Sequence, residues 1–394
     1  MNKPFEKYIQ QFSPELQWLI QLSRKNHTKE GADPYVPNMN PQQFFTLLHR
    51  HKLTSLVQED VQKLKTLLSD SFIEKYHHKL QAHTKRTMAL TREMLKISSG
   101  LEKQNIPHLV LKGPVLSQIL YADPLVKNSV DMDFLIPFEY IEKAHSFIEN
   151  QGYTRFYPSG HLSSRQQQIN YKLTHHYSYY KHRELFSLEL HWNLINPREL
   201  LPLTFKKLYE NHSSIVIANQ SLKTISCMHY LIYLAVHGSK HRWYSLGWLK
   251  DFSTLTSIVS ETERTQAIDF AMDKGLEKPL IQAYMLSHLI YHTPLPEPLL
   301  QMYKQEKGID SFIGEALQAI QKPLHKPGHN KVRIQRYTLK LRKNYAYKFK
   351  TLFRLKTHHK DWEIIHLPDQ LFFLYYPLRP LIYFIRLTKR KKGK

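Results

Sequence analysis

The sequence predicts an α+β fold in which a small β-sheet core is flanked by helical regions on its N- and C-terminal sides. Apolar residues recur at helical spacing through residues 1–104 and again through 201–321. Between these regions, residues 105–200 alternate short β-branched or aromatic runs with helical stretches. Residues 322–394 differ again, because they combine a strong basic charge with amphipathic patterns. We therefore expect four regions with these boundaries.

The expected elements follow from the apolar periodicity and from Pro and Gly breaks. The first region is expected to contain helices over 5–22, 41–51, 56–75 and about 76–104. The core is expected to contain strands over 108–112, 130–136 and 153–157, helices over 114–121 and 138–151, and a hairpin of 177–181 with 185–192. After a linker at 322–328, one long amphipathic helix is expected over 331–356.

Two aspartates lie two residues apart in the strand expected over 130–136. Successive side chains of a strand point to opposite faces, so Asp131 and Asp133 share one face and the alternate positions face the core. The core-facing positions are Val130, Met132, Phe134 and Ile136. Paired carboxylates are costly to bury unless cations compensate their charge. Because Mg²⁺ takes hard oxygen ligands, this pair predicts a divalent-cation site.

A third carboxylate and a lysine complete the candidate site. Glu189 and His191 share one face of the strand expected over 185–192, so a neighbouring strand could bring Glu189 to the aspartates. Lys112-Gly113 ends the strand at 108–112, and a proline then opens a helix. Together these residues could hold the phosphates of a nucleotide and two divalent metal ions.

At these positions the chain resembles the nucleotidyltransferases of the DNA polymerase β superfamily, and within them a poorly characterised bacterial branch. The resemblance covers about residues 85–260. The matching residues are Leu111-Lys112-Gly113, Leu120-Tyr121 with Asp123-Pro124, Lys127, Asp131 to Phe134, Gly152-Tyr153, Glu189 to Trp192, His237 with His241, and Trp248 to Asp251.

The resemblance implies a small mixed sheet and transfer of a nucleoside monophosphate from a nucleoside triphosphate, most simply ATP, to an acceptor hydroxyl. It implies that Asp131, Asp133 and Glu189 are the catalytic ligands of two Mg²⁺ or Mn²⁺ ions. It also implies a nucleotide-binding set, which is Lys112, Gly113, Lys127, Ser129 and His191. The sequence does not identify the acceptor.

The chain departs from the family pattern at two positions. Pro114 stands where the superfamily usually has Ser, which removes a hydroxyl and a backbone donor to phosphate. Lys127 stands where the branch commonly has Arg, which keeps the positive charge but loses the planar fork that binds phosphate bidentately. The alternative to an enzyme is a non-catalytic protein with the same fold that binds RNA or an anionic membrane surface.

The basic charge is concentrated at the C-terminal end. The chain has 56 Lys and Arg and 33 Asp and Glu, a net charge of +23, and residues 322–394 contribute +17 of it. Within 331–356 a basic stripe runs beside the apolar positions. This stripe is either the solvated face of a docked helix or a binding surface for a phosphate-rich partner.

An unusually apolar segment, 371–385, precedes the basic run 389–392. It is too short, and too interrupted by proline and arginine, to span a bilayer. Two interpretations stay open. The segment lies in an anionic membrane interface, or it closes the hydrophobic core of the helical domain over 201–321.

Other features exclude several classes of function. The chain contains no GxxxxGK[ST], HExxH or GxSxG motif. Its single cysteine, Cys227, excludes an internal disulfide and lies in an apolar run, which favours a buried packing role. His175 and His176 are adjacent in sequence, so we expect them to diverge and to be exposed. Because the first residues lack an apolar signal core, a cytoplasmic location is expected, with peripheral attachment at the inner membrane face as an extension.

Overall fold

A computed structural model describes residues 3–24, 39–63, 68–182, 186–322, 331–353, 357 and 359–392. At its centre lies a five-stranded sheet in the order β1-β2-β5-β4-β3. Its strands are β1 (Leu109–Leu111), β2 (Asp131–Leu135), β3 (Thr154–Tyr157), β4 (His176–Lys181) and β5 (Phe186–His191). β2 and β5 are parallel and the other neighbours are antiparallel, so the sheet is mixed. The predicted α+β class and the hairpin of β4 with β5 are confirmed.

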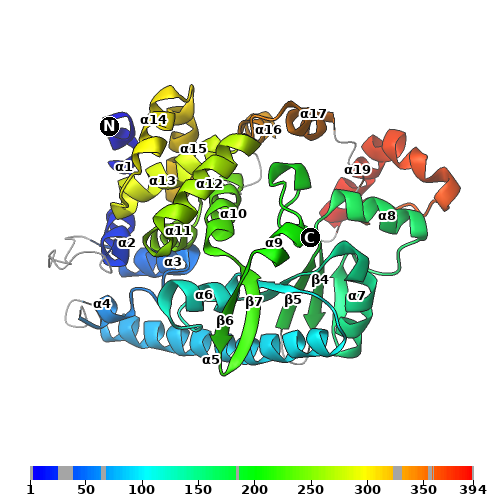
Figure 1. Ribbon diagram of the computed structural model, residues 1–394, viewed down its shortest axis with the longest axis horizontal. Helices are drawn as coiled ribbons and strands as arrows, with labels where there is room; N and C mark the ends of the chain where they lie inside the picture. The colour runs from blue at the N-terminus through cyan, green and yellow to red at the C-terminus, as the bar shows by residue number, and fades with distance from the viewer. Residues whose placement is uncertain are drawn as a thin grey trace.

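Two helices cover one face of the sheet (Figure 1). The long helix α5 (Asp70–Lys103) contributes Leu90 and Met94, and α7 (Ile141–Asn150) contributes Ile148. These side chains share a hydrophobic core with Met132 and Phe134 of β2. Because side chains alternate along a strand, this packing leaves the opposite face of β2 to the aspartates.

The N-terminal helices pack with the helices that follow the sheet. The N-terminal helices are α1 (Lys3–Ile9), α2 (Pro14–Arg24), α3 (Pro41–His51) and α4 (Gln58–Lys63). The later ones are α10 (Cys227–Lys240), α11 (Leu246–Ile258), α12 (Glu261–Lys274), α13 (Glu277–Tyr291), α14 (Glu297–Gln305) and α15 (Ile309–Gln321). Both groups contribute to a single hydrophobic core. Arg50, near the end of α3, donates hydrogen bonds of 2.6 to 2.9 Å to three carbonyls at the end of α15.

A β-hairpin stands where helical spacing was expected within 201–321. β6 (His212–Ile217) and β7 (Gln220–Ile225) are joined by Ala218 and Asn219, which both have positive φ, as a two-residue hairpin turn of type I′ requires. Thr224 of β7 donates a hydrogen bond of 2.6 Å to the carbonyl of Val110 in β1. The hairpin therefore joins the edge of the main sheet to the helical region.

Three further helices lie between these elements. They are α6 (Gly113–Tyr121), α8 (Ser164–Leu173) and α9 (Phe205–Glu210). The prediction of one helix over 56–75 is wrong, because α4 ends at Lys63 and α5 begins at Asp70, where the Ser69 side chain accepts a hydrogen bond from the Phe72 amide. Residues 64–67, between them, lie outside the described part of the chain.

The C-terminal region contains shorter helices than the sequence predicted. The expected helix over 331–356 is two helices, α16 (Lys331–Lys340) and α17 (Tyr345–Phe353). At the break, the Arg342 side chain donates to the carbonyl of Lys274 at 2.7 Å, and the Lys343 amide donates to the carbonyl of Gly275. α18 (His359–Trp362), a 3₁₀ turn (Asp369–Leu374) and α19 (Tyr375–Lys392) follow. Most of the expected linker at 322–328 lies outside the described residues.

Candidate active site

The turn between β1 and α6 is held in an unusual backbone conformation. Lys112 has φ 51° and Gly113 has φ 48°, which glycine tolerates but a lysine adopts only at a cost of about 1–3 kcal/mol. The Tyr230 hydroxyl accepts a hydrogen bond of 3.2 Å from the Lys112 amide. This contact helps to offset the strain and fixes the start of the Lys112 side chain beside β2.

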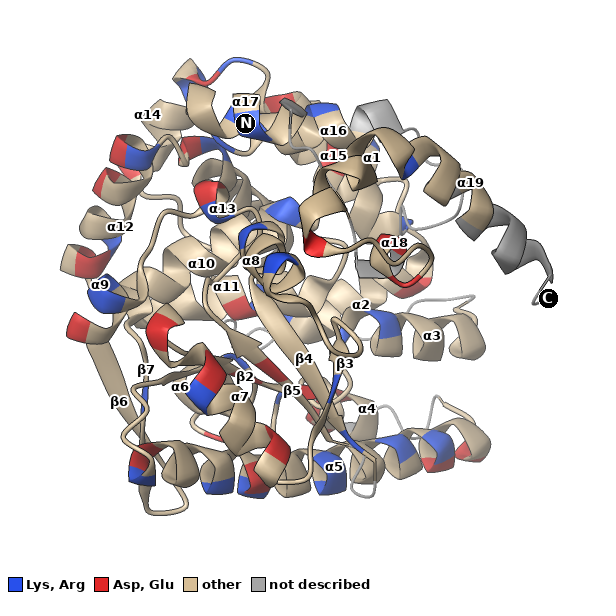
Figure 2. Cartoon of the chain, turned by 90° about the vertical axis from the view of Figure 1, so that its right-hand side faces the viewer, with Lys and Arg blue, Asp and Glu red and all other residues tan. Residues whose placement is uncertain are grey.

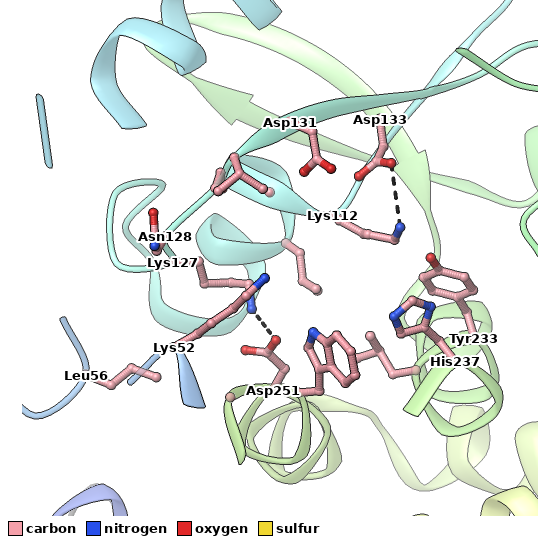
Figure 3. Close-up of a pocket in the computed structure, with 17 residues that line it drawn as sticks. Lys52, Leu56, Lys112, Lys127, Asn128, Asp131, Asp133, Tyr233, His237 and Asp251 are labelled. Atoms are coloured by element: carbon pink, nitrogen blue, oxygen red, sulfur yellow. Dashed lines mark hydrogen bonds and ion pairs between the residues drawn. The ribbon is translucent and has the colours of Figure 1, made fainter. Parts of the chain in front are cut away.

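Strand register brings the three predicted carboxylates to neighbouring positions. Asp133 of β2 is aligned with Glu189 of β5, and Asp131 is aligned with Ser187. Asp131 and Asp133 point to the same side of β2, into a cavity (Figure 3). The prediction that these aspartates share a face is therefore confirmed. Val130 was expected to face the core, but it precedes the first strand residue and is 40% exposed at the cavity.

Asp133 is buried between two cationic partners. His191 Nε2 lies 2.8 Å from Asp133 Oδ1, and Lys112 Nζ lies 3.6 Å from the same oxygen. Burial opposes ionisation, but Lys112 and the His191 hydrogen bond outweigh it and hold the pKa of Asp133 well below its usual range. Against the cost of burial, Asp133 in turn raises the pKa of Lys112. Asp133 is therefore ionised and Lys112 is protonated, so the two form an ion pair.

Asp131 is in the opposite electrostatic situation. The structure shows no hydrogen bond or ion pair to its carboxylate from the described residues. Burial and the negative charge of Asp133 raise the pKa of Asp131 to about 6, although Lys112 opposes the shift. A divalent cation would relieve this repulsion, so the arrangement fits a metal ligand.

Glu189 joins the cluster through histidine. His191 Nε2 also lies 3.1 Å from Glu189 Oε2, and His176 Nε2 lies 3.6 Å from the other oxygen. Burial disfavours the protonated His191 ring, but the hydrogen bonds to Asp133 and Glu189 raise the pKa of His191 to about 9. The same His191 bond outweighs burial and lowers the pKa of Glu189.

The histidines at the start of β4 do not behave as the sequence predicted. His175 and His176 were expected to diverge into solvent, but both are partly buried and their nearest ring nitrogens are 3.2 Å apart. Burial lowers the pKa of His176 to about 4 and holds the pKa of His175 well below its usual range. The reason is that His175 precedes the strand, so the alternation of a regular strand does not separate the two rings.

The cavity has a volume of about 230 Å³ and combines carboxylates with three lysines. Lys52 comes from the residue after α3, Lys112 from the β1–α6 turn, and Lys127 from the loop before β2 (Figure 3). Partial burial lowers the pKa of Lys52; Asp131 opposes this shift and Lys127 adds to it. Such a concentration of ammonium groups suits a polyanionic ligand.

Lys127 is held by a carboxylate on the opposite wall. Its ammonium group pairs with Asp251 of α11, whose other oxygen accepts a hydrogen bond of 3.1 Å from Tyr121. Ser129 also lines the cavity, and its buried hydroxyl has no hydrogen-bond partner among the described residues. Gly113 approaches Ser129 closely, because a Cβ at Gly113 would stand 3.4 Å from the Ser129 hydroxyl oxygen.

Helices α10 and α11 supply cavity residues that lie outside the predicted catalytic and nucleotide-binding sets. Tyr233 and His237 are four residues apart on α10, and Trp248 and Asp251 are three apart on α11, so each pair lies on one helix face. Helical spacing could have found these pairs. No sequence signal pointed to Lys52, which is brought in by tertiary packing.

The donor set fits divalent cations. Asp133, Glu189 and His191 each offer a ligand atom within 4.8 Å of the others, and Asp131 faces the same space without a cationic partner in the described part of the chain. Carboxylate oxygens on two adjacent parallel strands suit Mg²⁺ or Mn²⁺. Lys112 and His191 supply the positive charge at these carboxylates in the structure.

Comparison with known protein families identifies the family of the chain. No curated protein matches the chain. A protein-family model described as an uncharacterised nucleotidyltransferase matches residues 37–292, which is more than half of the chain and includes every residue of the cavity and the three carboxylates. The match begins before α3 and ends after α13. The chain therefore belongs to this nucleotidyltransferase family.

Proposed function

We propose that the protein transfers a nucleoside monophosphate from a nucleoside triphosphate, such as ATP, to an acceptor hydroxyl. The observation that carries the proposal is the cavity itself, in which Asp131 and Asp133 face Lys52, Lys112 and Lys127. Carboxylates for cations and ammonium groups for phosphates are the two components that phosphoryl transfer requires. A nucleophile with its base would have favoured a different chemistry.

In the proposed reaction the acceptor oxygen forms a bond to the α-phosphorus. The bond from that phosphorus to its bridging oxygen breaks, pyrophosphate leaves with the bonding electrons, and the hydroxyl proton passes to solvent. Lys52 would neutralise charge on the phosphates, Lys127 would donate to them while Asp251 holds it in place, and Ser129 would donate its free hydroxyl to one of them. Mg²⁺ or Mn²⁺ held by Asp131, Asp133 and Glu189 would supply Lewis-acid stabilisation of the developing charge.

The histidines would position the carboxylates rather than react. His191 bridges Asp133 and Glu189 through one nitrogen, and His176 contacts the outer oxygen of Glu189. When a nucleotide and its cations enter, Lys112 would turn from Asp133 toward phosphate, because the cations replace its charge at the carboxylate. The acceptor would approach along the wall formed by Tyr233, His237 and Trp248.

The direct test follows labelled phosphate. Purified protein is incubated with Mg²⁺, a cell extract and each of the four nucleoside triphosphates labelled at the α-phosphate. We expect label on one class of acceptor together with release of unlabelled pyrophosphate. If no label is transferred from any of the four triphosphates, with Mg²⁺ or with Mn²⁺, the proposal that the protein is an enzyme is contradicted.

Lys52 gives a test of the phosphate site. Lys52→Met removes a cavity ammonium group without disturbing the hydrophobic core, so KM for the triphosphate should rise by about tenfold with a smaller change in kcat. Lys206→Met is the matched control, since the Lys206 side chain is 86% exposed on α9. Equal KM values for the two variants would exclude Lys52 from the nucleotide site.

A separate observation, on the C-terminal segment 371–385, supports the alternative function, which is attachment to an anionic membrane surface at the cytoplasmic face. The C-terminal segment lies at the edge of the molecule (Figures 1 and 2). One side of it is buried, where Phe372, Tyr375 and Ile382 pack with Trp362. The other side exposes Phe373 by 60%, besides Leu381 and Phe384. The exposed side supports the membrane interpretation. The buried side forms a separate small core around Trp362 and does not belong to the core of the helical domain, which the other interpretation named. Among the described residues, no helix has the length and apolar character to cross a bilayer.

Liposome binding tests this attachment. Phe373→Ser with Phe384→Ser should reduce co-sedimentation with anionic vesicles by at least about tenfold, because each aromatic ring would otherwise be buried in lipid. Phe156→Ser, at a ring 53% exposed on β3, is the control. Binding should also weaken as salt rises. Unchanged co-sedimentation of the double variant would contradict membrane attachment. RNA binding in a gel shift that falls with salt, but is the same in the wild type and the double variant, would favour RNA as the partner.

A further inference from the structure

Three histidine rings cluster where β4 begins and β5 ends. His176 is aligned with His191 across the strands, and His175 immediately precedes β4. The ring centroids of His175 and His176 lie 5.4 and 5.0 Å from that of His191. Each ring offers a nitrogen, and the three nitrogens lie within 4.8 Å of one another.

The two nitrogens of His191 face different surroundings. Nε2 lies within hydrogen-bond distance of the carboxylates of Asp133 and Glu189. Nδ1 is buried and has no hydrogen-bond partner in the part of the chain that the structure describes. His191 is only 2% exposed, so solvent does not satisfy this atom. A buried ring nitrogen without a partner is costly, and metal-ligating histidines typically donate their other N–H to a carboxylate.

We propose that His175, His176 and His191 bind a transition-metal ion such as Zn²⁺, with the fourth coordination position open to water or a ligand. At a tetrahedral zinc with bonds of about 2.0–2.1 Å, two ligand nitrogens stand about 3.3 Å apart. His176 Nδ1 lies 3.2 and 3.3 Å from the two nitrogens of His175. Imidazole is a ligand of zinc, copper and nickel, whereas Mg²⁺ prefers oxygen. The ion is thus chemically distinct from the one proposed at the carboxylates.

The ion would bind the Nδ1 of His191 and displace to solvent the proton that this nitrogen carries when the ring is cationic. It would therefore fix the tautomer that donates from Nε2 to Asp133 and Glu189, and so orient both carboxylates. Nothing in this binding requires nucleotidyl transfer, so the site can exist even if the proposed reaction does not.

Metal binding tests the proposal without an activity assay. The full-length protein, in millimolar Mg²⁺ to fill oxygen sites, is titrated with Zn²⁺ against a chromogenic chelator, and separately with Co²⁺. We expect one tight site and the intense visible bands of tetrahedral Co²⁺. His175→Asn and His176→Gln should each weaken Zn²⁺ binding by at least about tenfold. His182→Ala, at an exposed histidine just after β4, should not.

Two results would overturn the proposal. One is a weak, octahedral Co²⁺ spectrum of the wild-type protein, which requires no variant and so does not depend on variant folding. The other is unchanged Zn²⁺ affinity in either cluster variant when its thermal unfolding matches that of the wild type.

Discussion

Asp131→Asn and Asp133→Asn should each lower nucleotidyl transfer by at least about a thousandfold while leaving the chain folded. Both carboxylates face the cavity from one rigid strand, and loss of a metal ligand removes several kcal/mol of transition-state stabilisation. The measurement is the rate of pyrophosphate release, with the triphosphate that the labelling experiment identifies as the substrate. Full activity in either variant would contradict the assignment of the metal ligands.

The two variants should differ in stability when divalent cations are absent. The pKa of Asp131 is raised, so its charged form is disfavoured in the folded state, and Asp131→Asn should raise the free energy of unfolding at pH 7 by about 1 kcal/mol. The pKa of Asp133 is lowered by its cationic partners, so Asp133→Asn should lower that free energy by about 3 kcal/mol. Urea unfolding in a chelator measures both. Changes of the same sign would mean that the two carboxylates do not differ as the structure indicates.

Glu189→Gln should lower transfer by at least about a hundredfold and weaken Mn²⁺ binding. Glu189 is aligned with Asp133 across parallel strands, so the amide would replace one charged ligand of a shared ion. Mn²⁺ affinity measured by electron paramagnetic resonance separates this effect from misfolding.

The control for Glu189 comes from a surface helix. Glu184, which strand alternation predicts on the opposite face, lies outside the described residues. Glu149→Gln on α7 serves instead, because the Glu149 side chain is 49% exposed and α7 packs on the face of the sheet opposite the aspartates. If Glu189→Gln and Glu149→Gln both behave like the wild type, the third ligand must come from another residue.

The carboxylate pair could be predicted because its geometry is local. A period of two along one strand puts Asp131 and Asp133 on the same face whatever the strand pairs with. The place of Glu189 required a further fact, that β2 and β5 are parallel neighbours in register, whereas the sequence indicated only that a neighbouring strand could bring it to the aspartates. The structure supplies it.

The errors came from tertiary contacts that local patterns do not contain. The helix expected over 331–356 breaks where Arg342 and Lys343 bond to carbonyls at the end of α12, and a periodic sequence does not reveal such a docking site. Lys52 and Lys112 both line the cavity although they are 60 positions apart in the chain, so only the tertiary fold brings them together. His175 was misread because its ring turns inward just before a strand begins.

The most direct measurement is a crystal structure of the protein with Mn²⁺ and a non-hydrolysable ATP analogue, using anomalous scattering to locate the metal. The proposed function predicts an anomalous peak about 2.1 Å from oxygens of Asp131, Asp133 and Glu189, with the triphosphate in contact with Lys52 and Lys127. A metal peak bound by other residues, or a nucleotide outside the cavity of about 230 Å³, would contradict it.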